Sequence, residues 1–172
     1  MTGTASPTIR TFRPGDLTQV RDLFASGLME FAGDVSDQVQ RYVDHSLRDD
    51  MADIPGHYLS GLRSNFWVAD SAGEVVGIVG IQPREQPDEA ELRRMSVSPT
   101  VRRQGLGQRL LETTEEFCRG NGYRRICLSS VNILQPALAM YQKYGYRLVK
   151  EEPYGEPPHQ VIVVHHMIKE LG

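Results

Sequence analysis

The sequence predicts a single mixed α/β domain built around one β-sheet. Short apolar runs typical of strands alternate with amphipathic runs typical of helices. A strand–helix–strand unit lies at the centre of this order, which requires one parallel strand pair. Two strand-like runs earlier in the chain lie so close together that they pair antiparallel. A length of 172 residues can bury a sizeable core, so we expect one domain spanning residues 1–172.

Bulk composition excludes several classes of function. The formal net charge of −3 gives no reason to expect a nucleic-acid surface. No apolar run approaches the length of a membrane span, and residues 1–8 have no apolar signal core. Cys118 and Cys127 fall in a predicted helix and a predicted strand, so we expect buried thiols rather than a disulfide. These features predict a cytoplasmic protein that does not bind membranes.

The first part of the chain predicts a strand followed by three helices. Residues 8–12 alternate in polarity and form the strand. Asp16 caps the first helix with Gln19 as its capping-box partner, Ser36 caps the second, and Asp50 caps the third. The residues expected to face the core are Leu17, Val20, Phe24 and Leu28, then Val39, Val43 and Leu47, then Ile54, Tyr58 and Leu62.

The middle of the chain predicts a hairpin and then the central unit. Strands 66–69 and 75–81 flank a turn at 71–74, and the polar segment 82–89 forms a loop. Strand 92–97 then leads through glycines into a helix that stops at 120–122. The apolar run 126–128 follows as a strand parallel to the first, with a right-handed crossover.

The last part predicts one more helix and two strands. Pro136 fits the first turn of the helix, and Gly145 ends it. Residues 146–149 and 161–167 form the strands, with a loop at 153–158 between them.

The turn between the central strand and its helix predicts an anion site. Gly105 and Gly107 carry no Cβ, so backbone N–H groups can approach a ligand there. The first N–H groups of a helix lack internal partners, and the helix dipole favours a phosphate. Arg102 and Arg103 add positive charge beside it. The alternative is a solvated turn in which glycine serves only the backbone geometry.

Two well-known nucleotide motifs do not fit this turn. A dinucleotide-binding fold needs a third glycine where Leu110 stands and an acidic residue where Ser129 and Ser130 follow the next strand. A phosphate-binding P-loop needs Gly-Lys-Ser/Thr, which is absent.

The Arg-x-x-Gly-x-Gly pattern at 102–107, after a strand ending in Val-Ser-Pro, resembles the pyrophosphate-binding motif of the GNAT acetyltransferase superfamily. Residues 91–97 resemble that family's fourth strand, and residues 137–146 resemble its last helix with the Gly-aromatic that follows. The likeness in element order covers residues 8–168. It implies the GNAT fold, a mixed, mostly antiparallel sheet of about seven strands whose fourth and fifth strands are parallel and splay apart.

A closer likeness is to the cysteine-S-conjugate and aspartate N-acetyltransferase branch. It is carried by residues 42–44, 50–54, 66–69 and 140–142. Those relatives have a long hydrophobic membrane segment after the first helix, and residues 31–36 contain nothing like it.

By resemblance the cosubstrate is acetyl-CoA. Its pyrophosphate would bind the N–H groups of residues 103–108, and its pantetheine arm would pair with the backbone of the fourth strand near a bulge. An N–H near Val97 would then face the thioester oxygen. The resemblance implies these cofactor-binding residues: Met95, Ser96, Val97, Arg102, Arg103, Gln104, Gly105, Leu106, Gly107, Gln108 and, two positions earlier than usual, Asn132.

Two catalytic residues follow from the family pattern. Tyr141 matches the general acid that protonates the leaving thiolate, and the alternative is a core tyrosine. Glu91 matches a general base, and the alternative is an ion pair with Arg93 on the same face of the strand. A second recurrent base position on the fifth strand is Ser129, which is not a base, so Glu91 or a water relay takes the proton.

Arg93 and Arg94 stand in a strand expected to be central, where an unpaired guanidinium is costly. They are either salt-bridged or reach into the acceptor pocket, where an arginine would bind a carboxylate through two hydrogen bonds. His159, His165 and His166 lack a supporting Cys or carboxylate cluster, so no metal site is expected.

The sequence therefore predicts an acetyl-CoA-dependent N-acetyltransferase acting by direct attack of a primary amine on a small, amino-acid-like substrate. One alternative is acetylation of proteins or peptides, and another is a non-catalytic acyl-CoA-binding sensor. A homodimer is compatible with each.

Overall fold

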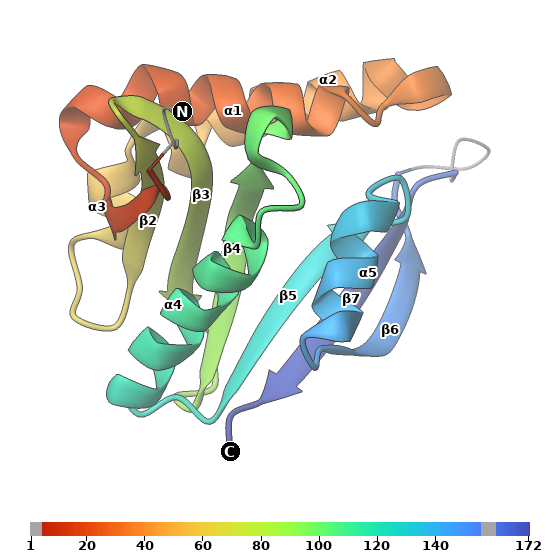
Figure 1. Ribbon diagram of the computed structural model, residues 1–172. Coiled ribbons are helices and arrows are strands. Elements are labelled where there is room, and N and C mark those ends of the chain that lie inside the picture. Colours follow the sequence, from red (N-terminus) through yellow and green to blue (C-terminus); the bar gives the residue numbers. More distant parts are fainter. Residues whose placement is uncertain (1–4, 156–160) are drawn as a thin grey trace.

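The computed structural model describes residues 5–155 and 161–172 and contains one seven-stranded sheet in the order β1-β2-β3-β4-β5-β7-β6. Only β4 and β5 pair in parallel, and the other neighbours are antiparallel. This confirms the predicted fold class (Figure 1). The strands are β1 (Thr8–Thr11), β2 (Asn65–Ser71), β3 (Glu74–Pro83), β4 (Glu89–Val97), β5 (Arg125–Val131), β6 (Arg147–Pro153) and β7 (Val163–Glu170).

Helices cover both faces of this sheet. In chain order they are α1 (Leu17–Met29), α2 (Ser36–Arg48), α3 (Ile54–Tyr58), α4 (Leu106–Gly120) and α5 (Gln135–Lys143). Neighbouring residues of β3 belong to different hydrophobic clusters. Val79 packs with residues of α4 and α5, and Ile78 packs with residues of α1, α2 and α3. Both faces of β3 are therefore buried, which explains its continuous apolar sequence.

The central unit β4–α4–β5 creates an opening in the sheet. The two strands pair only from Glu89 opposite Arg125 to Glu91 opposite Cys127. Beyond that point they diverge, as the gap that widens between β4 and β5 in Figure 1 shows. The predicted splay is confirmed.

A bulge bends β4 at the start of this opening. The pairing of β3 with β4 shifts between Ile78 opposite Ser96 and Gly80 opposite Arg93. Arg94, within the shift, has a φ of 57°, a left-handed conformation that is rare for a residue with a side chain. The bulge predicted for the fourth strand is therefore present.

The predicted helix caps are partly wrong. Asp16 does not cap α1, because its carboxylate binds the Arg10 guanidinium at 2.8 and 2.9 Å and accepts the N–H of Arg13. Gln19 instead accepts the Val75 N–H, tying α1 to the start of β3. Ser36 is the first residue of α2 and makes no side-chain cap.

The third predicted helix is also shorter than expected. Asp50 lies in a 3-10 turn, Asp50–Ala52, and is buried. α3 is capped by Asp53, whose Oδ1 accepts the Gly56 N–H at 3.0 Å. Leu62, expected in the core, is 91% exposed because α3 ends at Tyr58.

Other predictions hold. Cys118 and Cys127 are buried free thiols. Gly122 and Gly145 adopt positive φ angles of 81° and 98° where α4 and α5 stop. The predicted loop at 153–158 lies partly outside the described residues, and β6 extends through Pro153.

Candidate active site

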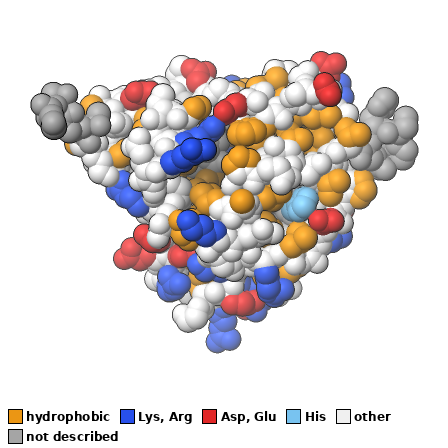
Figure 2. All heavy atoms as spheres, turned by 45° about the vertical axis from the view of Figure 1, so that its right-hand side comes forward, with side chains coloured by type: hydrophobic (Ala, Val, Ile, Leu, Met, Phe, Trp, Pro, Cys, Tyr) orange, Lys and Arg blue, Asp and Glu red, His pale blue; other side chains and the backbone are white. Residues whose placement is uncertain are grey.

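A cavity of about 860 Å³ opens where β4 and β5 diverge. Its walls come from α1, α2, β4, the turn before α4, β5 and α5. Figure 2 shows a hollow bordered by hydrophobic and by Lys or Arg side chains. The predicted site residues that line the cavity are Glu91, Arg93, Arg94, Met95, Ser96, Val97, Arg102, Arg103, Gly105, Leu106, Gly107, Gln108 and Tyr141. Gln104 and Asn132 are outside that lining.

The two glycines before and within α4 have different roles. Gly105 is the N-cap of α4 with a φ of 78°, and a Cβ there would meet nothing within 4 Å. It therefore leaves the helix N-terminus open, where unpaired N–H groups and the helix dipole favour an anion. A Cβ on Gly107 would lie 2.6 Å from Met140 Sδ. A Cβ at Gly107 would therefore meet the flexible Met140 side chain where α4 packs against α5, and Gly107 also lines the cavity.

Arg102 is already engaged in an ion pair. Its two terminal nitrogens donate to the Glu30 carboxylate at 2.7 and 2.6 Å, and its guanidinium lies 5.5 Å from the Phe31 ring centre. The hydrogen bonds from Arg102 lower the pKa of Glu30. Arg103 is exposed and makes no ion pair with any described residue. Of the two, Arg103 is the cation free to meet a phosphate.

The backbone of β4 faces the gap at Val97. Ser98 donates its N–H to Val76 O at 2.8 Å, and Val97 stands opposite Gly77. Because hydrogen-bonded and non-bonded pairs alternate in antiparallel strands, the N–H and C=O of Val97 point away from β3. They face the side where β5 has diverged.

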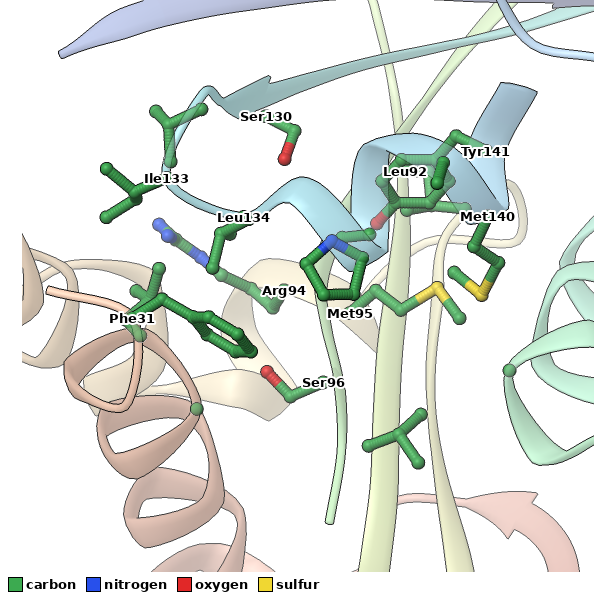
Figure 3. Close-up of a pocket in the computed structure, with 18 of the residues that line it drawn as sticks. Phe31, Leu92, Arg94, Met95, Ser96, Ser130, Ile133, Leu134, Met140 and Tyr141 are labelled. Carbon is green, nitrogen blue, oxygen red and sulfur yellow. The ribbon is translucent and has the colours of Figure 1, made fainter. Parts of the chain in front are cut away.

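Tyr141 of α5 lies on the opposite wall. Figure 3 shows Met140 and Tyr141 across from Leu92 and Met95 of β4. Tyr141 is 5% exposed, and its ring meets the Tyr146 ring edge-on with centres 5.7 Å apart. Burial raises the pKa of its phenol, so the proton stays on oxygen at neutral pH. Within the described chain the Tyr141 hydroxyl makes no hydrogen bond, which leaves it free to donate one to a ligand.

Glu91 pairs with Arg93, which was the alternative to a role as general base. Its carboxylate lies 3.7 Å from Arg93 Nε, and its side chain is 37% exposed. Arg93 also donates to Gln82 Oε1 at 2.9 Å and reaches Asp50 at 4.0 Å. Both side chains still line the cavity.

Arg94 forms a buried salt bridge, one of the two alternatives that the sequence left open for it. Its guanidinium donates to the two Asp50 oxygens at 3.0 and 2.6 Å, and these side chains are only 6% and 1% exposed. Further bonds run to the Tyr42 hydroxyl and Ser46 Oγ. Burial alone would raise the pKa of Asp50, but hydrogen bonds from Arg94 and Tyr58 outweigh it and lower that pKa. Arg94 therefore anchors the bulge to the 3-10 turn at Asp50.

Asn132 also has a structural partner. Its Oδ1 accepts the Val163 N–H at 2.9 Å, and its Nδ2 donates to Val161 O at 3.2 Å. These bonds fix the end of β5 to the strand beside it. The family's usual position, Leu134, does line the cavity. Among residues 5–155 and 161–172 no group of metal-ligating side chains occurs, and His159 lies outside them.

A polar chain of three side chains lies behind the cavity and was not predicted from the sequence. Ser129 lines the cavity, and its Oγ lies 2.8 Å from His166 Nδ1. The other ring nitrogen of His166 binds Glu152 Oε1. These residues come from β5, β7 and β6, and only the pairing register brings them together, so no sequence spacing signals the cluster.

The chain belongs to the acetyltransferase (GNAT) family. The family's sequence model, described as "Acetyltransferase (GNAT) family", matches residues 30–146. This range includes β4, α4, β5 and α5, which build the cavity.

Curated relatives place the chain near the branch that the sequence suggested. It is 41% identical over 111 residues to human "N-acetyltransferase 8B", covering 62% of this chain and 49% of that protein. It is 40% identical over 117 residues to "N-acetylaspartate synthetase" of Danio rerio, covering 67% of this chain and 42% of that one. The chain thus spans about half the length of the curated relatives it matches. Across the described ranges, no helix is both long and apolar enough to cross a membrane.

Solved structures of the same fold match nearly the whole chain. A GNAT-family acetyltransferase from Staphylococcus aureus superposes with a TM-score of 0.78 at 19% identity, covering 97% of this chain and 100% of that one. PaiA N-acetyltransferase from Thermoplasma acidophilum was solved in complex with coenzyme A. It superposes with a TM-score of 0.78 at 16% identity, covering 96% of this chain and 99% of that one. At these identities the likeness shows the fold.

Proposed function

We propose that the protein is an acetyl-CoA-dependent N-acetyltransferase that acts on the primary amine of a small, amino-acid-like acceptor. The observation that carries this proposal is the buried Tyr141 hydroxyl, unpaired within the described chain, in the same cavity as Val97, whose backbone groups point away from β3. One face offers a proton donor and the other offers backbone groups, as acyl transfer from a thioester requires.

The residues fit acetyl-CoA at the helix end of the cavity. The open position at Gly105 and the N-terminus of α4 suit its pyrophosphate, with Arg103 beside them. The backbone at Val97 suits the pantetheine arm, as an added strand would pair there. Acetyl-CoA supplies the activated acetyl group as a thioester.

The chemistry assigned to the protein is proton transfer and charge stabilisation. Alkyl ammonium groups have a pKa of about 10.4, and only the neutral amine attacks, so a base must accept its proton. The Val97 N–H stabilises the oxygen of the tetrahedral intermediate. Tyr141 gives its proton to the thiolate that leaves and regains one from solvent.

The acceptor end of the cavity favours a small zwitterionic amine. Arg94 is occupied by Asp50, so Arg93 is the guanidinium that would bind an acceptor carboxylate. Tyr42 of α2 and Tyr154 after β6 meet edge-on, with ring centres 6.5 Å apart, and both line the cavity. Two touching aromatic rings in the lining favour a small acceptor over a folded protein substrate. A matched relative is named for N-acetylaspartate synthesis, which is consistent with such an acceptor.

The test is thiol release from acetyl-CoA with a panel of amines, run on the wild type, Tyr141→Phe and the control Tyr146→Phe. The panel contains amino acids, S-substituted cysteines, polyamines and short peptides. We expect Tyr141→Phe to lower kcat by about 100-fold, the low end of a general-acid contribution, with acetyl-CoA affinity unchanged. Tyr146 lies outside the cavity lining, so its variant should keep wild-type turnover.

Other outcomes have defined meanings. Peptides as the best acceptors would replace the small-amine assignment. Acetyl-CoA binding without transfer to any amine would indicate a sensor module. Equal turnover in the wild type and Tyr141→Phe would remove the acid assignment.

A further inference from the structure

We propose that Ser129, His166 and Glu152 form a relay that carries the proton of the acceptor amine from the cavity to solvent. This proposal rests on the acetyl transfer proposed above. It replaces Glu91 as the proton acceptor and gives a role to Ser129, which alone is too weak a base.

The geometry of the relay follows from the sheet. Ser129 of β5 and His166 of β7 are register partners, so their side chains lie on the same face. Ser129 lines the cavity and His166 does not, so the chain leads from the cavity outward. The His166 side chain is 29% exposed and that of Glu152 is 45% exposed, so the far end meets water.

The hydrogen-bond directions are set by Glu152. The hydrogen bond from His166, together with Lys150 at 3.2 Å, lowers the pKa of Glu152 and keeps it ionised. A carboxylate only accepts hydrogen bonds, so His166 Nε2 carries the ring proton. Nδ1 is then a free acceptor, and the Ser129 hydroxyl donates to it over 2.8 Å. This is the direction that proton removal from the cavity requires.

The step balances without a further reactant. The N–H bond of the acceptor ammonium breaks as its proton joins Ser129 Oγ, while the Ser129 O–H bond breaks and a new N–H bond forms at His166 Nδ1. The product is a neutral amine ready to attack and an imidazolium beside the Glu152 carboxylate. The imidazolium loses its Nε2 proton to water beside the Glu152 carboxylate, and exchange of the remaining ring proton with solvent between turnovers restores the Nε2–H tautomer.

Glu91 is less suited to this role than the relay. Its carboxylate is paired with the Arg93 guanidinium, 3.7 Å from Nε. Ser129 lines the cavity and bonds to His166.

The same strand offers a matched control. His165 lies next to His166 on the opposite face, and its Nδ1 is 3.6 Å from Glu151. It is thus a histidine–glutamate pair on the same two strands, but it does not line the cavity or bond to Ser129.

The experiment measures kcat and kcat/KM of acetyl transfer between pH 6 and 10 for the wild type, Ser129→Ala, His166→Gln, Glu91→Gln and His165→Gln. Below pH 8 we expect His166→Gln and Ser129→Ala each to lose at least tenfold in kcat/KM for the amine, with KM for acetyl-CoA unchanged. The loss should shrink toward pH 10, where the amine loses its proton unaided. Four groups face His166 and could change the pH dependence of kcat/KM. They are Ser129 and Cys127 on β5, and Lys150 and Glu152 on β6. His165→Gln should match the wild type.

A second readout does not depend on turnover. Long-range proton–nitrogen NMR spectra of the intact protein should show His166 as the Nε2–H tautomer, with Nδ1 perturbed in Ser129→Ala. An Nδ1–H tautomer overturns the relay. An active wild type with an unaffected His166→Gln overturns the relay alone, as does a loss confined to Glu91→Gln. A wild type that transfers acetyl to no amine overturns the proposed function and the relay together.

Discussion

The two walls of the cavity differ in how their polar side chains are used. On the wall formed by β4 and the turn before α4 (the β4 wall), two of the charged side chains are engaged by protein partners: Arg94 by Asp50, and Arg102 by Glu30. On the wall formed by β5 and α5, Tyr141 and Ser129 present hydroxyl groups to the cavity. The Arg94 and Arg102 guanidinium groups are thus held by structural partners, and the proton transfers are assigned to the hydroxyl groups of the opposite wall.

The structural role of the β4 charges follows from the bulge. A residue such as Arg94 in a left-handed conformation costs about 1–3 kcal/mol and persists when its surroundings hold it in place. The two hydrogen bonds from the Arg94 guanidinium to the buried Asp50 carboxylate supply that restraint. The bulge lies beyond Glu91, the last β4 residue that pairs with β5, and so along the edge of the cavity.

The largest effect is expected from loss of the buried ion pair between Arg94 of the β4 wall and Asp50. Asp50→Ala leaves the buried Arg94 guanidinium without its carboxylate, and removing one partner of a buried pair costs about 3–5 kcal/mol. Urea unfolding followed by circular dichroism measures the change. The neighbour Asp49 is exposed, so Asp49→Ala should stay within about 0.5 kcal/mol of the wild type. Equal stability of the two variants would show that the β4 charges are not structural.

The same pair predicts an acid dependence of stability. Because the folded pKa of Asp50 is lowered, its contribution is fully present above the unfolded value of about 3.9 and is lost as the pH falls through the folded value. Asp50→Asn should therefore have a flatter stability profile than the wild type below pH 4. An unchanged acid slope would contradict the assignment.

A smaller effect is expected where the β4 wall meets the cosubstrate. Glu30→Gln removes the carboxylate that holds Arg102 and frees this cation for a phosphate. An exposed ion pair contributes up to about 1 kcal/mol, so acetyl-CoA affinity should rise by no more than about fivefold, and more at low salt. Isothermal titration at two salt concentrations measures this. Weaker binding would mean that the Glu30–Arg102 pair builds the cradle, and Asp34→Asn on the exposed surface is a charge-matched control.

The sequence predicted the sheet, its parallel pair and the turn at Gly105 because these depend on local patterns. Alternating apolar runs, the strand–helix–strand order and the glycine before α4 are all readable along the chain. It could not assign Arg94, because a strand position does not say which distant carboxylate is buried against it. Asp50 looked like a helix cap for the same reason: its partner lies 44 residues further along the chain. The Ser129–His166–Glu152 chain likewise depends on registers between three strands, which are fixed only when the sheet forms.

The smallest effect is expected at Tyr146, whose ring meets that of Tyr141 edge-on beside the cavity. Tyr146 is 2% exposed, and within the described ranges its hydroxyl is a buried polar group with no partner. An unsatisfied buried hydroxyl is destabilising, so Tyr146→Phe should be neutral or raise the free energy of unfolding by up to about 1 kcal/mol, with turnover unchanged. Tyr141→Phe should show the reverse, a loss of turnover at nearly constant stability. Denaturation and thiol-release assays on both variants measure the contrast. If Tyr146→Phe destabilises the fold by more than about 1 kcal/mol, its hydroxyl has a bound-water partner. The distinction between the two tyrosines would then lie only in access to the cavity.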